Sequence, residues 1–129
     1  MANGKLQTIL YVEDDLDIQT VARLALEAVG GFTVTICSSG REALATVEAD
    51  FHPDLILLDV MMPEMDGPTT LEALRRLPQT AATPVVFMTA KVQGSETAHY
   101  KSLGAMGVIP KPFDPMQLAQ QVQALWEQR

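Results

Sequence analysis

Acidic, hydroxyl and amino side chains stand at the ends of four short apolar runs of this sequence. The positions are Glu13, Asp14, Asp15, Asp59, Thr89 and Lys111. Crowded carboxylates repel one another, and Mg²⁺ suits such a place because it binds one or two carboxylates together with water and phosphoryl oxygens. A carboxylate can also attack phosphorus as a nucleophile and form an acyl phosphate. These residue types therefore predict Mg²⁺-assisted phosphoryl transfer to a carboxylate, provided that the fold brings them together.

The other members of the set would serve the same chemistry. A phosphoryl group in transfer needs positive charge around its oxygens. The cation and Lys111 would supply that charge, Thr89 would add a hydroxyl donor, and the small Ala90 would leave room. Each residue alone also has an ordinary structural explanation; Asp15, for example, suits the N-cap of a following helix. The chemical interpretation depends on all of them reaching one rim of the fold.

Five short apolar runs predict the strands that would place these residues. They are mostly continuous and rich in β-branched residues, as expected for strands buried on both faces of a parallel sheet. The runs are Ile9–Val12, Val34–Cys37, Leu55–Leu58, Val85–Met88 and Val108–Ile109.

Helical patterns fill the gaps between these runs. One ends at Gly30-Gly31, a second begins with a capping box of Ser39 and Glu42, and the last begins with Asp114 as its N-cap. The other two cover residues 71–77 and 95–103. Five β-α units predict a three-layer, doubly wound α/β domain, in which ligands bind beyond the carboxyl ends of the strands.

Composition narrows the class of protein further. The chain has 129 residues, enough for one domain with its own core, and a formal net charge of −7 that disfavours direct binding to nucleic acid. A single cysteine, Cys37, excludes an internal disulfide. No apolar run is long enough for a membrane span or a secretory signal. We therefore expect a cytoplasmic protein without membrane insertion.

Four segments, in order, resemble the receiver domain of two-component response regulators, including single-domain regulators of chemotaxis. They are Ile9 to Asp15 (ILYVEDD), Leu57 to Gly67 (LLDVMMPEMDG), Met88-Thr89-Ala90, and Gly104-Ala105 through Lys111-Pro112-Phe113. The second segment is highly specific, and the resemblance covers essentially the whole chain. It implies a flavodoxin-like (βα)5 fold with five parallel strands in the order 2-1-3-4-5.

The resemblance also implies a role for each site residue. Asp59 is similar to the aspartate that accepts a phosphoryl group from a histidine kinase or a histidine phosphotransfer protein. Thr89 resembles the switch hydroxyl, and Lys111 resembles the lysine that pairs with the phosphoryl oxygens. The Lys111–Pro112 bond is similar to one that is cis in this family, and Gly67 suits a turn that needs a positive φ.

The metal site follows from the same resemblance. The Mg²⁺ ligands would be Asp14 directly, Glu13 mainly through water, Asp59, and the backbone carbonyl of Met61. A shift by one residue, to Asp14 and Asp15, remains an alternative, although the end of the strand at Val12 argues against it.

Three positions matter for how such a switch would work. Val108 occupies the site three residues before the lysine, where the family usually has Tyr or Phe, so the usual aromatic rotamer switch is in doubt. Pro110 removes a backbone donor, which fits an edge strand. Met61 and Lys91 stand near the approach of an attacking water, and an apolar Met61 predicts slow self-dephosphorylation.

The chain would act as a single receiver domain over residues 1–129 without an output domain, and its output would be a contact with a downstream protein. The family's readout surface is the fourth helix, the fifth strand and the fifth helix, which here contain Tyr100, Lys101, Gln117, Gln120 and Gln121. Ile18 and Gln19 resemble the usual kinase-docking face.

This signalling switch would not be an enzyme in the ordinary sense, and three other functions compete with it. A haloacid-dehalogenase-type phosphatase needs a second aspartate two residues after the nucleophile, where this chain has Met61. A degenerate receiver would bind partners without accepting phosphate; the intact Asp14, Asp59, Thr89 and Lys111 argue against it, whereas Val108, in place of the usual aromatic residue, keeps this alternative open. An FMN-binding flavodoxin would need a Gly/Ser/Thr-rich phosphate loop after the first strand.

Overall fold

The predicted strands form one parallel sheet. The computed structural model describes residues 4–90 and 94–129. Its strands are β1 (Thr8–Val12), β2 (Thr33–Cys37), β3 (Leu55–Asp59), β4 (Val85–Thr89) and β5 (Gly107–Pro110). They pair in the order β2-β1-β3-β4-β5, which confirms the predicted three-layer topology. No helix in the described part of the chain is both long enough and apolar enough to span a bilayer.

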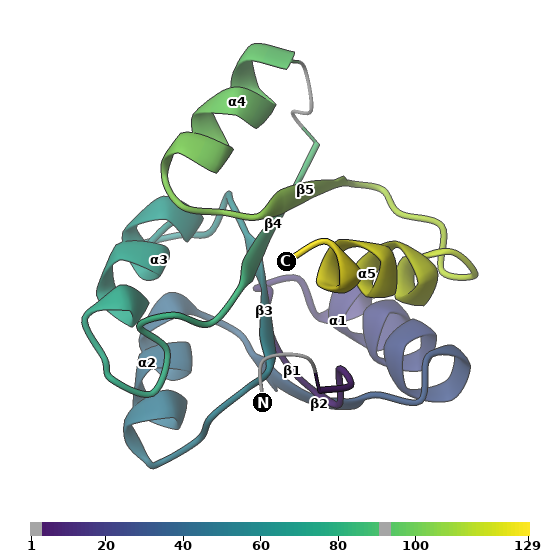
Figure 1. The fold of residues 1–129 in the computed structure, drawn as a ribbon, viewed down its shortest axis with the longest axis horizontal. Coiled ribbons are helices and arrows are strands. Elements are labelled where there is room, and N and C mark those ends of the chain that lie inside the picture. The colour runs from purple at the N-terminus through teal and green to yellow at the C-terminus, as the bar shows by residue number, and fades with distance from the viewer. Residues whose placement is uncertain (1–3, 91–93) are drawn as a thin grey trace.

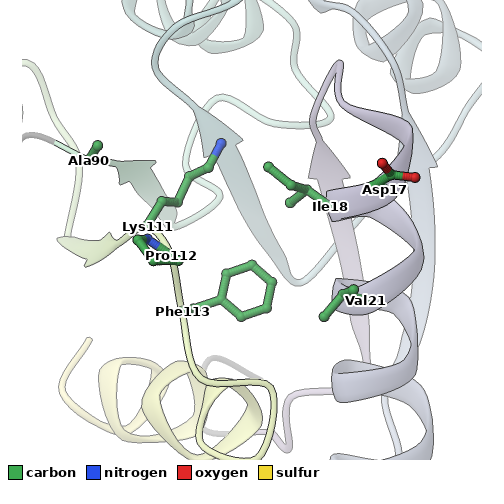
Figure 2. Close-up of a pocket in the computed structure, with 7 residues that line it drawn as sticks. All are labelled: Asp17, Ile18, Val21, Ala90, Lys111, Pro112 and Phe113. Atoms are coloured by element: carbon green, nitrogen blue, oxygen red, sulfur yellow. The ribbon is translucent and has the colours of Figure 1, made fainter.

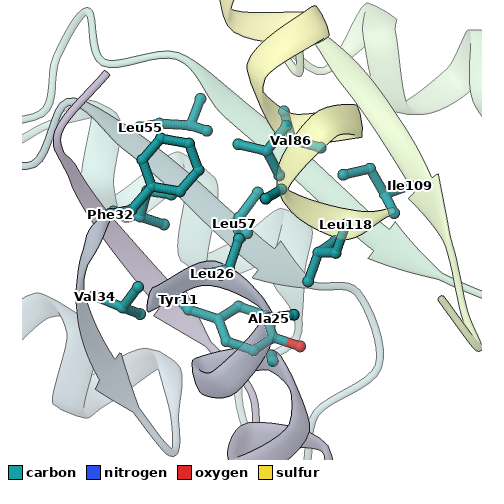
Figure 3. Packing of buried hydrophobic residues seen from close by; sticks show 14 of the residues in the cluster. Tyr11, Ala25, Leu26, Phe32, Val34, Leu55, Leu57, Val86, Ile109 and Leu118 are labelled. Atoms are coloured by element: carbon teal, nitrogen blue, oxygen red, sulfur yellow. The ribbon is translucent and has the colours of Figure 1, made fainter. Parts of the chain in front are cut away.

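Helices cover both faces of the sheet (Figure 1). They are α1 (Leu16–Arg23), its π-helical continuation η1 (Leu24–Val29), α2 (Gly40–Glu48), α3 (Gly67–Arg75), α4 (Gly94–Ser102) and α5 (Leu118–Glu127). The first core cluster joins the sheet to α1, η1 and α5, and includes Leu26, Leu118 and Tyr11 (Figure 3). A second cluster joins the opposite face to α2, α3 and α4. Because β3 and β4 are buried along their whole length, their last residues, Asp59 and Thr89, are held in place by close packing.

Side-chain hydrogen bonds cap the first turns of α1 and α2, the helices that follow β1 and β2. The Asp15 side chain accepts hydrogen bonds from the backbone N–H groups of Asp17 and Ile18, at 2.9 and 3.1 Å, and therefore caps α1 as predicted. At α2, Ser39 accepts from the N–H of Glu42, but the Glu42 carboxylate accepts from Ser38 rather than from Ser39. One of the two hydrogen bonds of the predicted capping box is therefore present, whereas the bond to the Glu42 carboxylate comes from the residue before the expected one.

The predicted start of the last helix was wrong. Helix α5 begins at Leu118, three residues after the expected first residue Pro115, and Asp114 is not its N-cap. Asp114 instead accepts from the N–H of Met116 at 2.9 Å, while its backbone carbonyl accepts from Gln117 and Leu118. The capping signal was real, but it stabilises a turn that precedes the helix.

The predicted reason for Gly67 was also wrong. Gly67 does not have a positive φ; it is the first residue of α3, and the left-handed residue of this loop is Glu64, with φ 68°. A Cβ at position 67 would lie 2.6 Å from the backbone oxygen of Asp59 and 2.8 Å from the Cα of Val60. Glycine is needed here because the backbone that follows β3 passes directly against α3.

Substitution of Gly67 by alanine is therefore expected to destabilise the protein by about 1–3 kcal/mol, the usual cost of overpacking a rigid contact. Urea denaturation of Gly67→Ala would measure it. Gly94→Ala is the matched control, because a Cβ at position 94 meets nothing within 4 Å. Equal stability of the two variants would contradict this explanation.

Candidate acidic site at the strand ends

The residues singled out by chemistry meet at the carboxyl edge of the sheet. A cavity of about 250 Å³ lies there, lined by Glu13, Asp14, Asp15, Ile18, Asp59, Met61, Thr89, Ala90 and Lys111. Asp59 and Thr89 are the last residues of β3 and β4, Glu13 and Asp14 follow β1, and Lys111 follows β5. Every predicted site residue is thus brought to one cavity, except Lys91, which lies outside the described residues.

Lys111 bridges the two buried carboxylates. Its Nζ donates to Glu13 Oε1 at 2.9 Å and to Asp59 Oδ1 at 3.2 Å. Both carboxylates are almost inaccessible, with residue exposures of 1% for Glu13 and 3% for Asp59. A buried charge persists only when it is paired, so the ammonium group compensates two acids that would otherwise repel each other across β1 and β3. The Lys111–Pro112 bond is cis, as expected.

The protonation of the site reflects this crowding. Burial, reinforced by the negative charge of Glu13 and opposed by Lys111, raises the pKa of Asp59 from 3.8 to about 6. For Lys111, burial alone would lower the pKa, but the hydrogen bond to Glu13 and the charge of Asp59 outweigh it and raise the pKa. Lys111 therefore remains an ammonium group, while the acid that faces it is only weakly held in its ionised form.

Three carboxylates have the geometry of a cation site. One carboxylate oxygen from each of Glu13, Asp14 and Asp59 lies within 4.8 Å of the other two. Asp14 is exposed toward the cavity, whereas Asp15 is occupied as the N-cap of α1 and is not a member of the group. The donor set consists of hard oxygens only, which suits Mg²⁺. This arrangement favours the pair Glu13 and Asp14 over the alternative shift to Asp14 and Asp15.

Tyr11 is a site residue that the sequence reasoning missed. Its hydroxyl donates to Glu13 Oε1 at 3.3 Å, and the whole residue is buried. Burial, together with the negative charge of Glu13, raises its pKa, so the phenol stays protonated. The signal was present in the sequence, because residues two apart along a strand point to the same face.

An apolar groove adjoins the acidic cavity (Figure 2). It has a volume of about 450 Å³ and lies between α1 and the segment that follows β5. Asp17, Ile18 and Val21 line it from α1, and Ala90, Lys111, Pro112 and Phe113 line it from the opposite side. Figure 2 shows the Phe113 ring facing α1 and the Lys111 side chain extending toward the strand ends. An apolar side chain placed in this groove would therefore lie beside the carboxylates.

The comparison with known families identifies this arrangement. Residues 9–123 match the response regulator receiver domain, so the chain belongs to the receiver domains of two-component response regulators. It is a signalling switch by family, and its strand order is the flavodoxin-like order of that class.

Individual relatives agree. The chain is 37% identical over 120 residues to the transcriptional regulatory protein CpxR of Escherichia coli (strain K12), covering 93% of this chain and 49% of CpxR. It is 33% identical over 117 residues to the response regulator SaeR of Staphylococcus aureus (strain USA300), covering 91% of this chain and 49% of SaeR. The chain thus spans about half the length of these curated relatives.

Solved structures agree as well. Chemotaxis response regulator CheY4 of Vibrio cholerae superimposes with a TM-score of 0.85 at 30% identity, covering 94% of this chain and 99% of CheY4. A putative response regulator from Chloroflexus aurantiacus J-10-fl superimposes with a TM-score of 0.83 at 31% identity, covering 95% and 99%.

Proposed function

We propose that this receiver accepts a phosphoryl group on Asp59 from a phosphohistidine of a histidine kinase or a phosphotransfer protein. The P–N bond of the donor breaks as a bond forms between phosphorus and the carboxylate oxygen of Asp59, and the leaving imidazole keeps the electron pair. The observation that carries this proposal is the Lys111 ammonium bridging Asp59 and Glu13 inside a carboxylate-lined cavity. An acid with an ammonium partner and open space beside it is arranged to receive a group that carries further negative charge.

Seven of the residues that line the cavity would take part in that reaction. Glu13, Asp14, Asp59 and the Met61 carbonyl would hold Mg²⁺, which when bound neutralises the carboxylates and the phosphoryl oxygens. Lys111 would pair with a phosphoryl oxygen, and Thr89, at the end of β4, would donate its hydroxyl to another. Ala90 keeps the neighbouring wall of the cavity small.

The apolar groove is suited to the phosphodonor protein. Ile18 and Gln19, at the start of α1, are half-buried, whereas Val21 is exposed, and Phe113 provides an aromatic wall opposite them. A helix that presents apolar side chains around a histidine could cover this groove and bring the imidazole to the cavity beside it.

Residues 1–129 would act as one receiver unit, which passes on its signal by binding a downstream protein through the face formed by α4, β5 and α5. Lys101, Gln117 and Gln120 are exposed there, and Gln121 is half-buried. Tyr100, expected on this surface, is instead buried and packs edge-on against Phe87 at 5.2 Å between ring centroids. Phe87 of β4 and Tyr100 of α4 thus form an aromatic pair in the core, in the cluster against which Val108 packs.

Intact-protein mass after incubation with Mg²⁺ and acetyl phosphate tests the proposal. We expect a single phosphoryl adduct in the native protein that is absent without Mg²⁺ and absent in Asp59→Asn. No adduct, or an adduct that persists in Asp59→Asn, would overturn the assignment and favour a receiver that binds partners independently of phosphate. Turnover of a phosphate monoester would favour the phosphatase alternative.

Met61 is expected to make the phosphorylated state long-lived. The residue is 67% exposed at the cavity, and its side chain offers no polar group to orient an attacking water. We expect a lifetime of minutes or more, and a several-fold shorter one for Met61→Gln, measured as loss of the adduct after the donor is removed. Met116→Gln is the matched control, because Met116 is equally exposed, at 70%, but does not line the cavity. A half-life of seconds in the native protein would contradict this expectation.

A further inference from the structure

Tyr11 places a hydroxyl group beneath the acidic cavity. The proposed phosphoryl transfer gives this hydroxyl group no role. The residue lies in β1 with 0% exposure, and its ring is packed in the core among residues of α1, η1 and α5 (Figure 3). A phenylalanine would fill the same space, and burying a hydroxyl costs free energy unless it is hydrogen-bonded. The bond from Tyr11 to Glu13 Oε1 offsets that cost and ties the hydrophobic core to the site.

The hydrogen bonds of Glu13 show what Tyr11 contributes. Its Oε2 accepts from the backbone N–H of Asp15 at 3.1 Å, which leaves Oε1 for two side-chain donors. These donors are Lys111 Nζ at 2.9 Å and the Tyr11 hydroxyl at 3.3 Å. The carboxylate is 1% exposed, so water is largely excluded from replacing either donor.

The two donors differ in freedom of movement. Lys111 is a long side chain that is shared with Asp59 and 17% exposed, so its ammonium can turn toward new oxygens in the cavity. Tyr11 is fixed by the packing of its ring. When Lys111 turns toward a phosphoryl group, Tyr11 is the side-chain donor that remains on Glu13 Oε1.

We propose that Tyr11 is a positioning residue, whose hydroxyl holds the Glu13 carboxylate in place so that Lys111 can leave it for the phosphoryl group. This inference rests on the proposed function. Without the hydroxyl, Glu13 would have Lys111 as its remaining side-chain donor on Oε1, and it would both retain the ammonium more tightly and hold a less defined orientation toward a cation.

The test is a double-mutant cycle of Tyr11→Phe and Glu13→Gln. The Mg²⁺ dissociation constant is measured by calorimetry, and the rate of adduct formation from acetyl phosphate by intact mass. We expect Tyr11→Phe to weaken Mg²⁺ binding and slow phosphorylation by about tenfold each, the lower end of the range for groups that orient metal ligands. In the Glu13→Gln background the same substitution should change the Mg²⁺ dissociation constant by less than about twofold, because the carboxylate that it positions is gone.

The cycle separates a positioning role from a merely structural one. If Tyr11→Phe changes the Mg²⁺ dissociation constant equally in both backgrounds, or leaves both the affinity and the phosphorylation rate unchanged, the inference is overturned. Thermal unfolding of each variant checks that the ring alone preserves the fold. Failure of the native protein to form the adduct would instead overturn the proposed function, so the two failures are distinguishable.

Discussion

Asp59→Asn is expected to stabilise the metal-free protein by about 2–3 kcal/mol at pH 7.5. In the native protein the pKa of Asp59 is about 6 instead of 3.8, so keeping this acid ionised in the fold costs roughly 1.4 kcal/mol for each unit of that difference. The amide of asparagine carries no charge to desolvate, and its oxygen can still accept from Lys111. Urea denaturation of both proteins without divalent cations would measure the difference.

The pH dependence of this effect has a defined sign. Because the pKa of Asp59 is raised in the fold, the folded state binds more protons than the unfolded state between about pH 4 and pH 6. This residue therefore makes the native protein lose stability as the pH rises through that window, and the loss is complete above it. Asp59→Asn should lack this decline, so the two stability curves should converge near pH 4.

Asp17→Asn is the matched control for charge. It removes one exposed acid of α1 without touching the buried pair, and it should change stability by less than about 0.5 kcal/mol. A stabilisation of Asp17→Asn equal to that of Asp59→Asn would mean that net charge, rather than the crowded site, limits stability. Saturating Mg²⁺ should reduce the difference in unfolding free energy between the native protein and Asp59→Asn. A ligand that binds only the folded state stabilises it, and the native protein keeps the Asp59 carboxylate as a proposed Mg²⁺ ligand.

The second large effect concerns Mg²⁺ itself. Asp14→Asn is expected to weaken Mg²⁺ binding by at least about tenfold and to reduce phosphorylation by acetyl phosphate in parallel, because Asp14 is the exposed carboxylate of the three-acid group. Calorimetric titration with Mg²⁺ would measure the affinity without requiring any reaction. Asp17→Asn again serves as the control, since Asp17 lies near the cavity but outside the group. Similar losses in both variants would show a diffuse electrostatic effect instead of a ligand.

The sequence was most informative where a pattern had one physical solution. Continuous apolar runs predicted all five strands, and the acids and hydroxyl that follow them lie where a parallel sheet must place them. The first turn of α5 and the reason for Gly67 were not predictable in the same way. The Asp114 motif stabilises a turn or a helix start equally well, and the contact of Gly67 with Asp59 exists only once α3 has packed against the end of β3.

For the site, too, the sequence predicted which residues take part but not how they share their contacts. Residue types and the resemblance to receiver domains predicted the set of Glu13, Asp14, Asp59, Thr89 and Lys111, and the structure brings all five to one cavity. The sequence did not reveal that Lys111 divides its ammonium between two acids, because sharing depends on distances of tenths of an ångström. Their roles in phosphoryl transfer remain predictions for the experiments above.

Pro110 limits how a partner can recognise the α4–β5–α5 face. β5 is an edge strand of four residues, and Pro110 is exposed at its end opposite Thr89, with no N–H group to offer. A partner that binds by adding a strand to a sheet needs an unbroken row of donors and acceptors along that edge. β-Augmentation is therefore disfavoured at this edge, and recognition there should depend on side chains. The same proline protects the sheet from edge-to-edge aggregation.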